Sequence, residues 1–325
     1  MITRRQSILG IGATALIPAL SFGQEKKIHR IGTLATGSAA SAGYLFAAFA
    51  QGLVDLGWVN GKNVLIENRY ADGNADLLRP LAEELVQRNV DVIVAGGSPQ
   101  ARAAKAATAT IPIVFATSVD PVGLGLVASL ARPGGNITGI STLAADLSAK
   151  RLQLLKQVFP KVSSVAVVVP RDETGRVQFI EIQRAALVLG IKVFSLEFGH
   201  PQDVERWNAS LQKWRADSMY VVDDAGTFNF RKLIIDFAAK NRLPAIFATK
   251  AHAQAGGLLS YGADYEQQFR RAATFVDKIL KGSKPGDLPV EQATNFDLVV
   301  NMKTAKVLGI KFPQSILVQA TKVIE

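Results

Sequence analysis

Small hydroxyl side chains and carboxylates recur in this 325-residue chain where short apolar runs end. The candidate binding residues of this kind are Thr36, Gly97, Ser98, Thr117, Asp120, Thr142, Asp223, Asp224 and Tyr261. Hydroxyl and backbone N–H groups bind anionic groups, whereas Asp carboxylates bind ammonium groups. Together these residue types suit a small molecule that carries both charges, such as a zwitterion.

Residue patterns of catalysis are missing from the sequence. The chain has no Cys, and His29, His200 and His252 lack the spacing of a metal site. The chain contains no GxGxxG after the first predicted strand, no GxxxxGK[ST], and no GxSxG or HExxH. We therefore predict no catalytic residue, no metal and no cofactor, and we disfavour a Rossmann-type enzyme.

The elements that must position these residues alternate between strand and helix. Strands are predicted at 28–34, 63–70, 91–95, 112–116 and 136–141, with helices at 44–56, 77–87, 99–107 and 121–130. The alternation restarts with strands at 165–169, 192–197, 219–222 and 245–247, and helices at 147–158, 177–189, 204–214 and 230–241. Such alternation predicts an α/β fold with two lobes, each a parallel sheet flanked by helices.

The C-terminal part breaks this alternation. A strand at 258–261, an amphipathic helix at 265–280 and a strand at 296–301 remain after two complete lobes. They indicate that the chain crosses back, so that a three-segment hinge joins the lobes around a central cleft. We predict lobe 1 at 28–142 and 262–283, and lobe 2 at 143–261 and 284–325.

The candidate residues follow predicted strands, and ligands of parallel sheets bind at the carboxyl ends of strands. Each candidate also has a structural interpretation. Ser98-Pro99 and Asp120-Pro121 would serve equally as helix caps, Asp223-Asp224 as a solvated turn, and Tyr261 as a core tyrosine.

The N-terminus has the pattern of an export signal over residues 1–23. Arg4 and Arg5 precede an apolar run at 8–20 and a small-x-small end at 21–23. Thr3 to Leu9 also resembles a twin-arginine signal, which leaves the export route open. Cleavage near Gly23 of a chain without Cys predicts a periplasmic protein that is not lipid-anchored.

Composition narrows the class further. Mean hydropathy is +0.18, but the longest apolar run is shorter than the roughly 20 residues that span a membrane. The net charge is +10, and dispersed Lys and Arg residues form no stripe with aromatic residues, so no nucleic-acid partner is predicted.

Five longer stretches together resemble one family. They are DPVGLGLVASLARPGGNITG at 120–139, KRLQLL at 150–155, AGGLLSYGADY at 255–265, DKILKGSKPGDLPVEQ at 277–292 and FDLVVNMKTAKVLGI at 296–310. The sequence resembles the ABC-transporter substrate-binding proteins related to the tryptophan-binding protein TrpX, over essentially the whole mature chain. The resemblance implies the type I periplasmic binding protein fold, with Rossmann-like lobes that close on a solute for an inner-membrane ABC permease. Members with known ligands take aromatic or other amino acids.

The resemblance carries over unevenly. Asp120-Pro121 matches the family's Asp-Pro segment, and Tyr261-Gly262 matches its Ser-Tyr-Gly crossing. Many relatives have Thr-Asp-Asn where this chain has Val222-Asp223-Asp224. The second carboxylate would favour a cationic or hydroxyl-rich ligand over a simple amino acid.

Together these observations predict a periplasmic solute-binding receptor of an ABC importer. We expect a monomer that binds an amino acid, or a related small carboxylate or aromatic compound, by hinge closure. The alternative is a ligand-sensing module that presents its closed form to a membrane sensor kinase or chemoreceptor. Fold and cleft would be the same in both.

Overall fold

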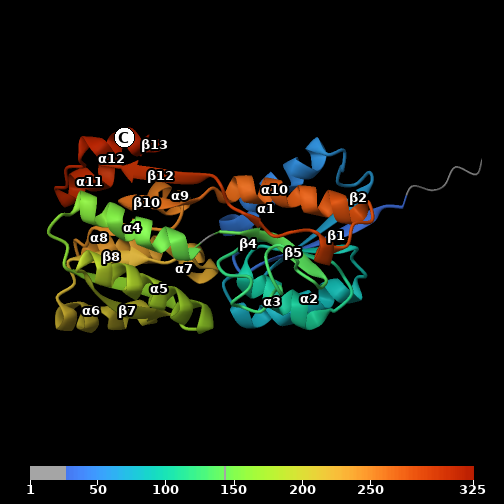
Figure 1. The fold of residues 1–325 in the computed structure, drawn as a ribbon, viewed down its shortest axis with the longest axis horizontal. Helices are drawn as coiled ribbons and strands as arrows, with labels where there is room; N and C mark the ends of the chain where they lie inside the picture. The colour runs from blue at the N-terminus through green and yellow to red at the C-terminus, as the bar shows by residue number, and fades with distance from the viewer. Residues whose placement is uncertain (1–26, 143) are drawn as a thin grey trace, which may run out of the picture.

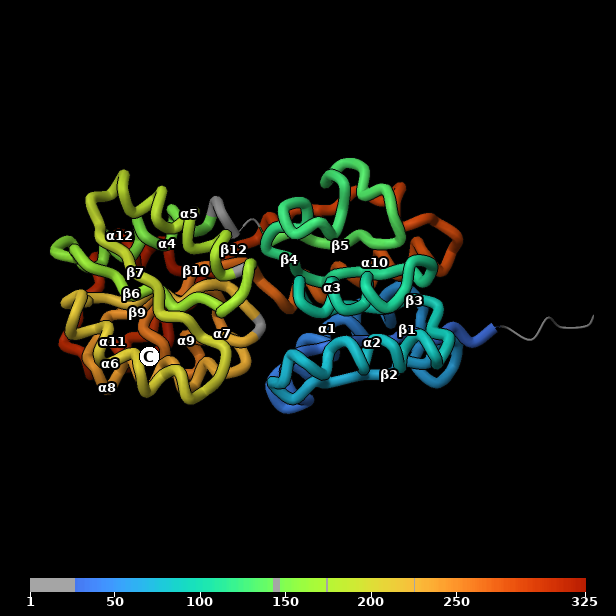
Figure 2. The backbone as a smooth tube through the Cα atoms, turned by 90° about the horizontal axis from the view of Figure 1, so that it is seen from below, coloured from blue at the N-terminus to red at the C-terminus, as the bar shows by residue number. Residues whose placement is uncertain are grey.

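The structure is a computed structural model that describes residues 27–142 and 144–325. Two lobes lie side by side along the long axis, each built on its own sheet (Figure 1), and the view from below has the same two-lobed outline (Figure 2). The predicted α/β architecture with parallel sheets flanked by helices is confirmed. The export signal predicted at 1–23 lies outside the described residues. Within the described ranges, no helix is both long enough and apolar enough to cross a membrane.

Lobe 1 has the strand order β11-β5-β4-β3-β1-β2. Its first segment contains β1 (His29–Ala35), α1 (Ala39–Asp55), β2 (Val64–Tyr70), a 3-10 turn (Ala75–Leu77), α2 (Leu78–Gln87), β3 (Val92–Ala95), α3 (Ser98–Ala107), β4 (Ile113–Ser118) and β5 (Ile137–Ser141). Later in the chain, α10 (Tyr265–Leu280), a second 3-10 turn (Pro285–Asp287) and β11 (Glu291–Gln292) complete it.

Lobe 2 has the strand order β13-β12-β10-β9-β8-β6-β7, in which β10 and β12 are antiparallel. Its first segment contains α4 (Ala144–Val158), β6 (Ser164–Pro170), α5 (Glu173–Leu189), β7 (Lys192–Phe198), α6 (Asp203–Trp214), β8 (Ser218–Val221), α7 (Ala225–Asn229), α8 (Arg231–Lys240), β9 (Ala245–Phe247), α9 (Lys250–Gln254) and β10 (Leu259–Ala263). Its second segment contains β12 (Phe296–Asn301), α11 (Met302–Leu308), α12 (Gln314–Gln319) and β13 (Lys322–Ile324).

The central strands are continuous apolar runs because both faces of each sheet are covered. In β3, Val92 and Val94 pack in the core beneath α1 and α10, whereas Ile93 and Ala95 face the core beneath α2 and α3. The period of two along a strand thus divides one run between two cores. This packing fixes the strand ends, and therefore the positions of the loops that follow them.

The chain passes between the lobes three times, and two of the predicted limits differ from the sheet pairing. β10 extends to Ala263 within the lobe 2 sheet, and α10 then packs on α1 of lobe 1. β11 pairs with β5, so residues 285–292 belong with lobe 1, although residues 284–325 were predicted in lobe 2. Residues 281–289 are rich in Gly and Pro and have the pattern of a loop. Val290, which follows them, is nevertheless buried, and its backbone N–H donates to the Leu130 carbonyl. Figure 1 shows this return to lobe 2 as the red segment that leads to β12.

One predicted helix is replaced by turns. Residues 121–125 form turns after β4 where a helix at 121–130 was predicted. Gly125 has a φ of 65°, a left-handed conformation that ends helical geometry. Conversely, α7 and α9 are short helices that the periodicity of the sequence does not reveal, because each has only 5 residues.

Candidate functional site

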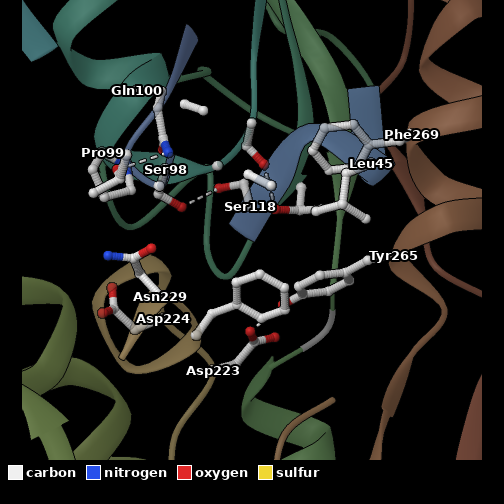
Figure 3. Close-up of a pocket in the computed structure, with 18 of the residues that line it drawn as sticks. Leu45, Ser98, Pro99, Gln100, Ser118, Asp223, Asp224, Asn229, Tyr265 and Phe269 are labelled. Atoms are coloured by element: carbon white, nitrogen blue, oxygen red, sulfur yellow. Dashed lines mark hydrogen bonds between the residues drawn. The ribbon is translucent and has the colours of Figure 1, made fainter. Parts of the chain in front are cut away.

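A cavity of about 700 Å³ lies between the lobes and is partly open to solvent. Lobe 1 lines it with the segments that follow β1 and β3, the end of β4, and residues of α1 and α10. Lobe 2 lines it with residues between Asp223 and Asn229, after β8. In Figure 3, Ser98, Ser118 and Gln100 lie on one side of this cavity, and Asp223, Asp224 and Asn229 lie on the other.

The lobe 1 side presents hydroxyl groups beside the start of α3. Gly97 is the N-cap residue of α3, and among the described residues no side chain bonds to the first N–H groups of this helix. The Ser98 and Ser118 hydroxyls hydrogen-bond each other at 2.9 Å, and the Thr117 hydroxyl donates to the Gly96 carbonyl at 2.9 Å. Free N–H groups and neutral hydroxyls give this side the character of an anion-binding site.

The lobe 2 side presents two neighbouring carboxylates. Asp224 caps α7, because its Oδ1 accepts hydrogen bonds from the N–H groups of Gly226 at 2.6 Å and Thr227 at 3.2 Å. Burial, followed by the nearby charge of Asp172, raises the pKa of Asp224 to about 6. The carboxylate is thus mostly ionised at neutral pH and gains its proton in mild acid.

Asp223 joins the two lobes through a hydrogen bond. It is buried and accepts a hydrogen bond from the Tyr265 hydroxyl at the start of α10. Burial raises the pKa of the Asp223 carboxyl, while the positive charge of Arg151 and the bond from Tyr265 act in the opposite direction. Burial, followed by the charge of Asp223, raises the pKa of Tyr265 well above its usual value, so the phenol stays protonated.

The buried Arg151 guanidinium stabilises this side of the cavity from behind. Its Nε donates to the Tyr261 carbonyl at 2.6 Å, and its Nη1 donates to the Tyr220 hydroxyl at 3.3 Å. The Tyr261 carbonyl belongs to β10, just before the second crossing between the lobes. Arg151 therefore links the carboxylate side of the cavity to the hinge.

Aromatic side chains form one wall of the cavity. The rings of Phe46 and Phe269 meet edge to face with centroids 5.1 Å apart, and those of Phe228 and Tyr265 lie 6.3 Å apart. Leu45 and Ala42 add aliphatic surface from α1. This wall suits the apolar part of a ligand.

The lobes also meet directly beside the cavity. The Ser41 hydroxyl of α1 donates to the Asn229 side-chain oxygen at 2.8 Å. The bond between Ser41 and Asn229 connects α1 to α7, and the bond between Tyr265 and Asp223 connects α10 to the segment before α7. Both α1 and α10 contribute to the apolar wall. The structure is thus a form in which the two sides of the cavity are close enough to share one small ligand.

Most of the residues predicted from the sequence line this cavity: Thr36, Gly97, Ser98, Thr117, Asp223 and Asp224. Asp223 and Asp224 are therefore not simply a solvated turn. The predicted role of Ser98 as the N-cap residue is wrong, because Gly97 takes that position and the Ser98 hydroxyl turns to Ser118.

The described residues that line this cavity do not include Asp120, Thr142 or Tyr261. The Asp120 Oδ1 accepts the N–H of Gly123 at 2.8 Å and so caps the turn that replaces the predicted helix. Thr142 is buried, and its hydroxyl donates to the Ser118 carbonyl at 3.2 Å. The Tyr261 ring packs against the lobe 2 core, 6.1 Å from the ring of Phe296, as the interpretation as a core tyrosine describes.

The list of candidate residues omits four polar residues of the cavity, which are Gln100, Ser118, Asn229 and Tyr265. Gln100 lies in the first turn of α3, and the sequence predicts the start of this helix. Its place beside the predicted binding residues Gly97 and Ser98 was therefore an available signal. Tyr265 opens the predicted helix after the second crossing. Asn229 belongs to the short helix α7, and no pattern in the sequence announces it.

The cavity offers no basic or metal-binding set. Among its lining residues, as far as the structure describes them, none is Lys, Arg or His. Across residues 27–142 and 144–325, no group of three or more His, Asp or Glu side chains is placed to hold a metal ion. His252 lies behind Phe228, and burial lowers its pKa to about 3, so it stays neutral. The cavity is suited to binding through two carboxylates, hydroxyls and backbone N–H groups.

Comparison with known proteins gives consistent matches. Residues 39–324 match the family model described as ABC transporter substrate binding protein. A tyrosine-binding protein of Clostridioides difficile is 29% identical over 81% of this chain and 76% of its own length. An ABC domain from Streptococcus pneumonia in complex with L-Trp has a TM-score of 0.85 and 25% identity, with 92% of this chain and 100% of that chain covered.

A ligand-free, open structure of a substrate-binding protein from Clostridium difficile gives a lower TM-score of 0.67, at 27% identity, covering 92% of this chain and 99% of that chain. Over the whole chain, the structure is thus more similar to the L-Trp complex than to the open protein. These matches confirm the predicted type I periplasmic binding protein fold.

Proposed function

The chain belongs to the ABC transporter substrate-binding proteins, which are binding proteins and not enzymes, and we propose that it binds a free α-amino acid as a zwitterion between its lobes. One observation carries this proposal. A single cavity joins the start of α3, whose first N–H groups have no side-chain cap among the described residues, to the carboxylates of Asp223 and Asp224.

The two sides are complementary to the two charges of an amino acid. The ligand carboxylate would accept hydrogen bonds from N–H groups of α3 and from whichever of the Ser98 and Ser118 hydroxyls does not donate to the other. The ligand ammonium would bind Asp223 and Asp224. Since no Lys or Arg of the described chain lines the cavity, a ligand with only negative charge would face uncompensated carboxylates.

The ligand side chain would lie against the aromatic wall. Phe46 and Phe269 of lobe 1, and Phe228 of lobe 2, provide apolar surface on that side. Relatives that bind tyrosine and L-Trp support an aromatic amino acid.

The second carboxylate does not by itself require a cationic ligand. Asp224 uses one oxygen to cap α7, a bond that an Asn oxygen would make equally well. Asp223 is opposed by the charge of Arg151 and by the Tyr265 hydroxyl. A single ammonium group therefore balances most of the charge that remains in the cavity.

Titration calorimetry with modified ligands tests the zwitterion directly. L-Trp, L-Tyr, L-Phe and L-Leu are the positive probes, and L-Lys is the probe for a cationic ligand. N-acetyl-L-Trp lacks the ammonium and L-Trp methyl ester lacks the carboxylate, so each should bind at least about 100-fold more weakly than L-Trp. Tight binding of both derivatives would overturn the proposal, and binding of L-Lys alone would overturn the placement of an apolar ligand side chain against the aromatic wall.

We further propose that the protein is an exported monomer that delivers this ligand to an inner-membrane ABC permease. The signal pattern at 1–23 and the family support export. Cell fractionation should recover the mature chain, beginning near Gln24, in the periplasmic fraction. Recovery of an unprocessed chain in the cytoplasm would contradict this assignment.

A further inference from the structure

Gln100 is a buried side chain that lines the cavity from the first turn of α3. Its exposed fraction is 3%, and its Nε2 donates to the Thr36 hydroxyl at 2.8 Å. Thr36 follows β1, so this bond holds the Gln100 amide between the ends of two neighbouring strands. Figure 3 shows the side chain reaching from α3 toward Ser98.

The other end of the same amide has no partner. Gln100 Oε1 is buried and, among the described residues, accepts no hydrogen bond. A buried acceptor left unpaired carries a cost in free energy, so such groups call for a partner. The neighbouring cavity residues Ser98, Ser118 and Thr117 already have hydrogen-bond partners within the protein.

The floor of the cavity lies between this acceptor and the aromatic wall. A Cβ atom built on Gly97 would be 3.2 Å from Gln100 Oε1 and 3.5 Å from the Thr117 hydroxyl oxygen. One built on Gly96 would be 3.6 Å from the Phe46 ring and 3.7 Å from the Phe269 ring. The two glycines thus form a floor without side chains, with apolar ring edges close to Gly96 and the Gln100 amide oxygen close to Gly97.

We propose that Gln100 contacts the ligand through Oε1, which accepts a hydrogen bond from an N–H or O–H group on the ligand side chain. This inference rests on the proposed function and narrows its substrate class. A ligand on the Gly96-Gly97 floor has an apolar body against Phe46 and Phe269 and a single polar edge toward Gln100. The pocket therefore selects a side chain that is largely apolar but carries one hydrogen-bond donor.

Pairs of ligands that differ only in the donor give the test. L-Tyr has the hydroxyl that L-Phe lacks, and L-Trp has the indole N–H that 3-benzothienyl-L-alanine replaces with sulfur. Calorimetry would measure all four with the unaltered protein and with Gln100→Met, which keeps the length of the side chain but removes the acceptor. Gln153→Met is the matched control, because Gln153 is exposed on α4 of lobe 2.

The unaltered protein should prefer the donor-bearing member of at least one pair by about 5- to 100-fold. Gln100→Met should reduce that ratio to near one, mainly by weakening binding of the donor-bearing ligand, while Gln153→Met keeps the ratio. Gln100→Glu, which retains an acceptor oxygen, should keep a preference for the donor. Thermal melting of each variant establishes that it is folded.

Three results would overturn the inference. The first is equal binding of both members of each pair by the unaltered protein. The second is a ratio that Gln100→Met leaves unchanged, and the third is an equal loss for all four ligands with a lower melting temperature, which would assign Gln100 a structural role only. If L-Leu binds the unaltered protein but none of the four does, the inference alone fails; if no amino acid binds it, the proposed function fails and the inference fails with it.

Discussion

The two sides of the cavity use different chemistry. Lobe 1 contributes hydroxyls and helix N–H groups that carry no full charge, whereas lobe 2 contributes the carboxylates of Asp223 and Asp224. Buried carboxylates need counter-charge, and lobe 2 supplies Arg151 behind Asp223. Neutral donors need no such support, and accordingly the Ser98 and Ser118 hydroxyls hydrogen-bond each other with no charged group as a partner.

This difference indicates which side of the cavity contributes most to the affinity for the ligand. An ionic contact to a buried carboxylate is stronger than hydrogen bonds from neutral hydroxyls, and it depends on pH. Lobe 2 should therefore determine how tightly the ligand ammonium is held. Lobe 1 should set the ligand's orientation and contribute smaller, pH-independent increments.

The largest effect is expected for Asp223→Asn. The amide keeps the shape of the side chain and still accepts the Tyr265 hydroxyl, but it removes the buried charge that faces the ligand ammonium. Binding of the best amino-acid ligand should weaken by about 3 kcal/mol, or more than 100-fold, by titration calorimetry. The matched control is Asp236→Asn, an exposed residue of α8. Unchanged affinity in Asp223→Asn would remove the carboxylate side from the binding site.

Lowering the pH should weaken ligand binding through Asp224. Its pKa of about 6 predicts an ionised side chain at pH 7 and a protonated one at pH 5, with about a tenfold loss of affinity for an ammonium group across this range. Asp224→Asn should flatten this part of the pH profile. A profile that keeps its inflection near pH 6 in the variant would assign the titration to another group.

The stability of the ligand-free protein should respond to pH with the opposite sign. The folded-state pKa of Asp224 is raised above its usual value of 3.8, so its contribution to the free energy of unfolding is fully present below about pH 4 and is lost as the pH rises through 6. Relative to Asp224→Asn, the unaltered protein should gain roughly 1 to 3 kcal/mol between pH 7 and pH 4. Chemical denaturation at each pH measures the difference.

A smaller effect is expected on the lobe 1 side. Ser98→Ala removes one hydroxyl of the pair with Ser118 and should weaken binding by about 1 kcal/mol, or roughly fivefold. The double variant with Ser118→Ala should cost less than the sum of the single variants, because both singles break the same hydrogen bond. Ser283→Ala, at an exposed position, is the control. A loss as large as that of Asp223→Asn would erase the difference between the two sides.

The sequence predicts those parts of the fold and site that depend on local pattern. Apolar runs such as residues 92–95 reveal central strands, and the residues after them reach the cavity because parallel strands end at one edge of the sheet. Thr36, Gly97 and Asp223 were found in this way. The same rule misplaces Asp120, since turns through Gly125 replace the helix that it was expected to precede.

Contacts that depend on how the lobes meet were beyond such reasoning. Tyr265 is adjacent to Asp223 only because the chain returns to lobe 1 at α10, and Asn229 meets Ser41 only across the cleft. The side that Tyr261 faces on β10 likewise depends on packing against Phe296, which lies 35 residues later in the numbering. No local periodicity contains that information.

The smallest expected effect on ligand binding concerns one of these contacts between the lobes, the hydrogen bond from Tyr265 to Asp223. Tyr265→Phe keeps the aromatic wall but removes the bond between the phenol of lobe 1 and the Asp223 carboxylate of lobe 2. The variant should destabilise the arrangement with the lobes together by about 1 kcal/mol of free energy relative to a more open arrangement. Ligand binding should weaken about two- to fivefold as a result. Small-angle X-ray scattering of the ligand-free variant should give a larger radius of gyration than that of the unaltered protein. Tyr70→Phe removes a hydroxyl from β2 of the same lobe and is the control. An unchanged radius and affinity in Tyr265→Phe would mean that the ligand alone, held by the carboxylates of lobe 2 and the α3 terminus of lobe 1, keeps the two sides together.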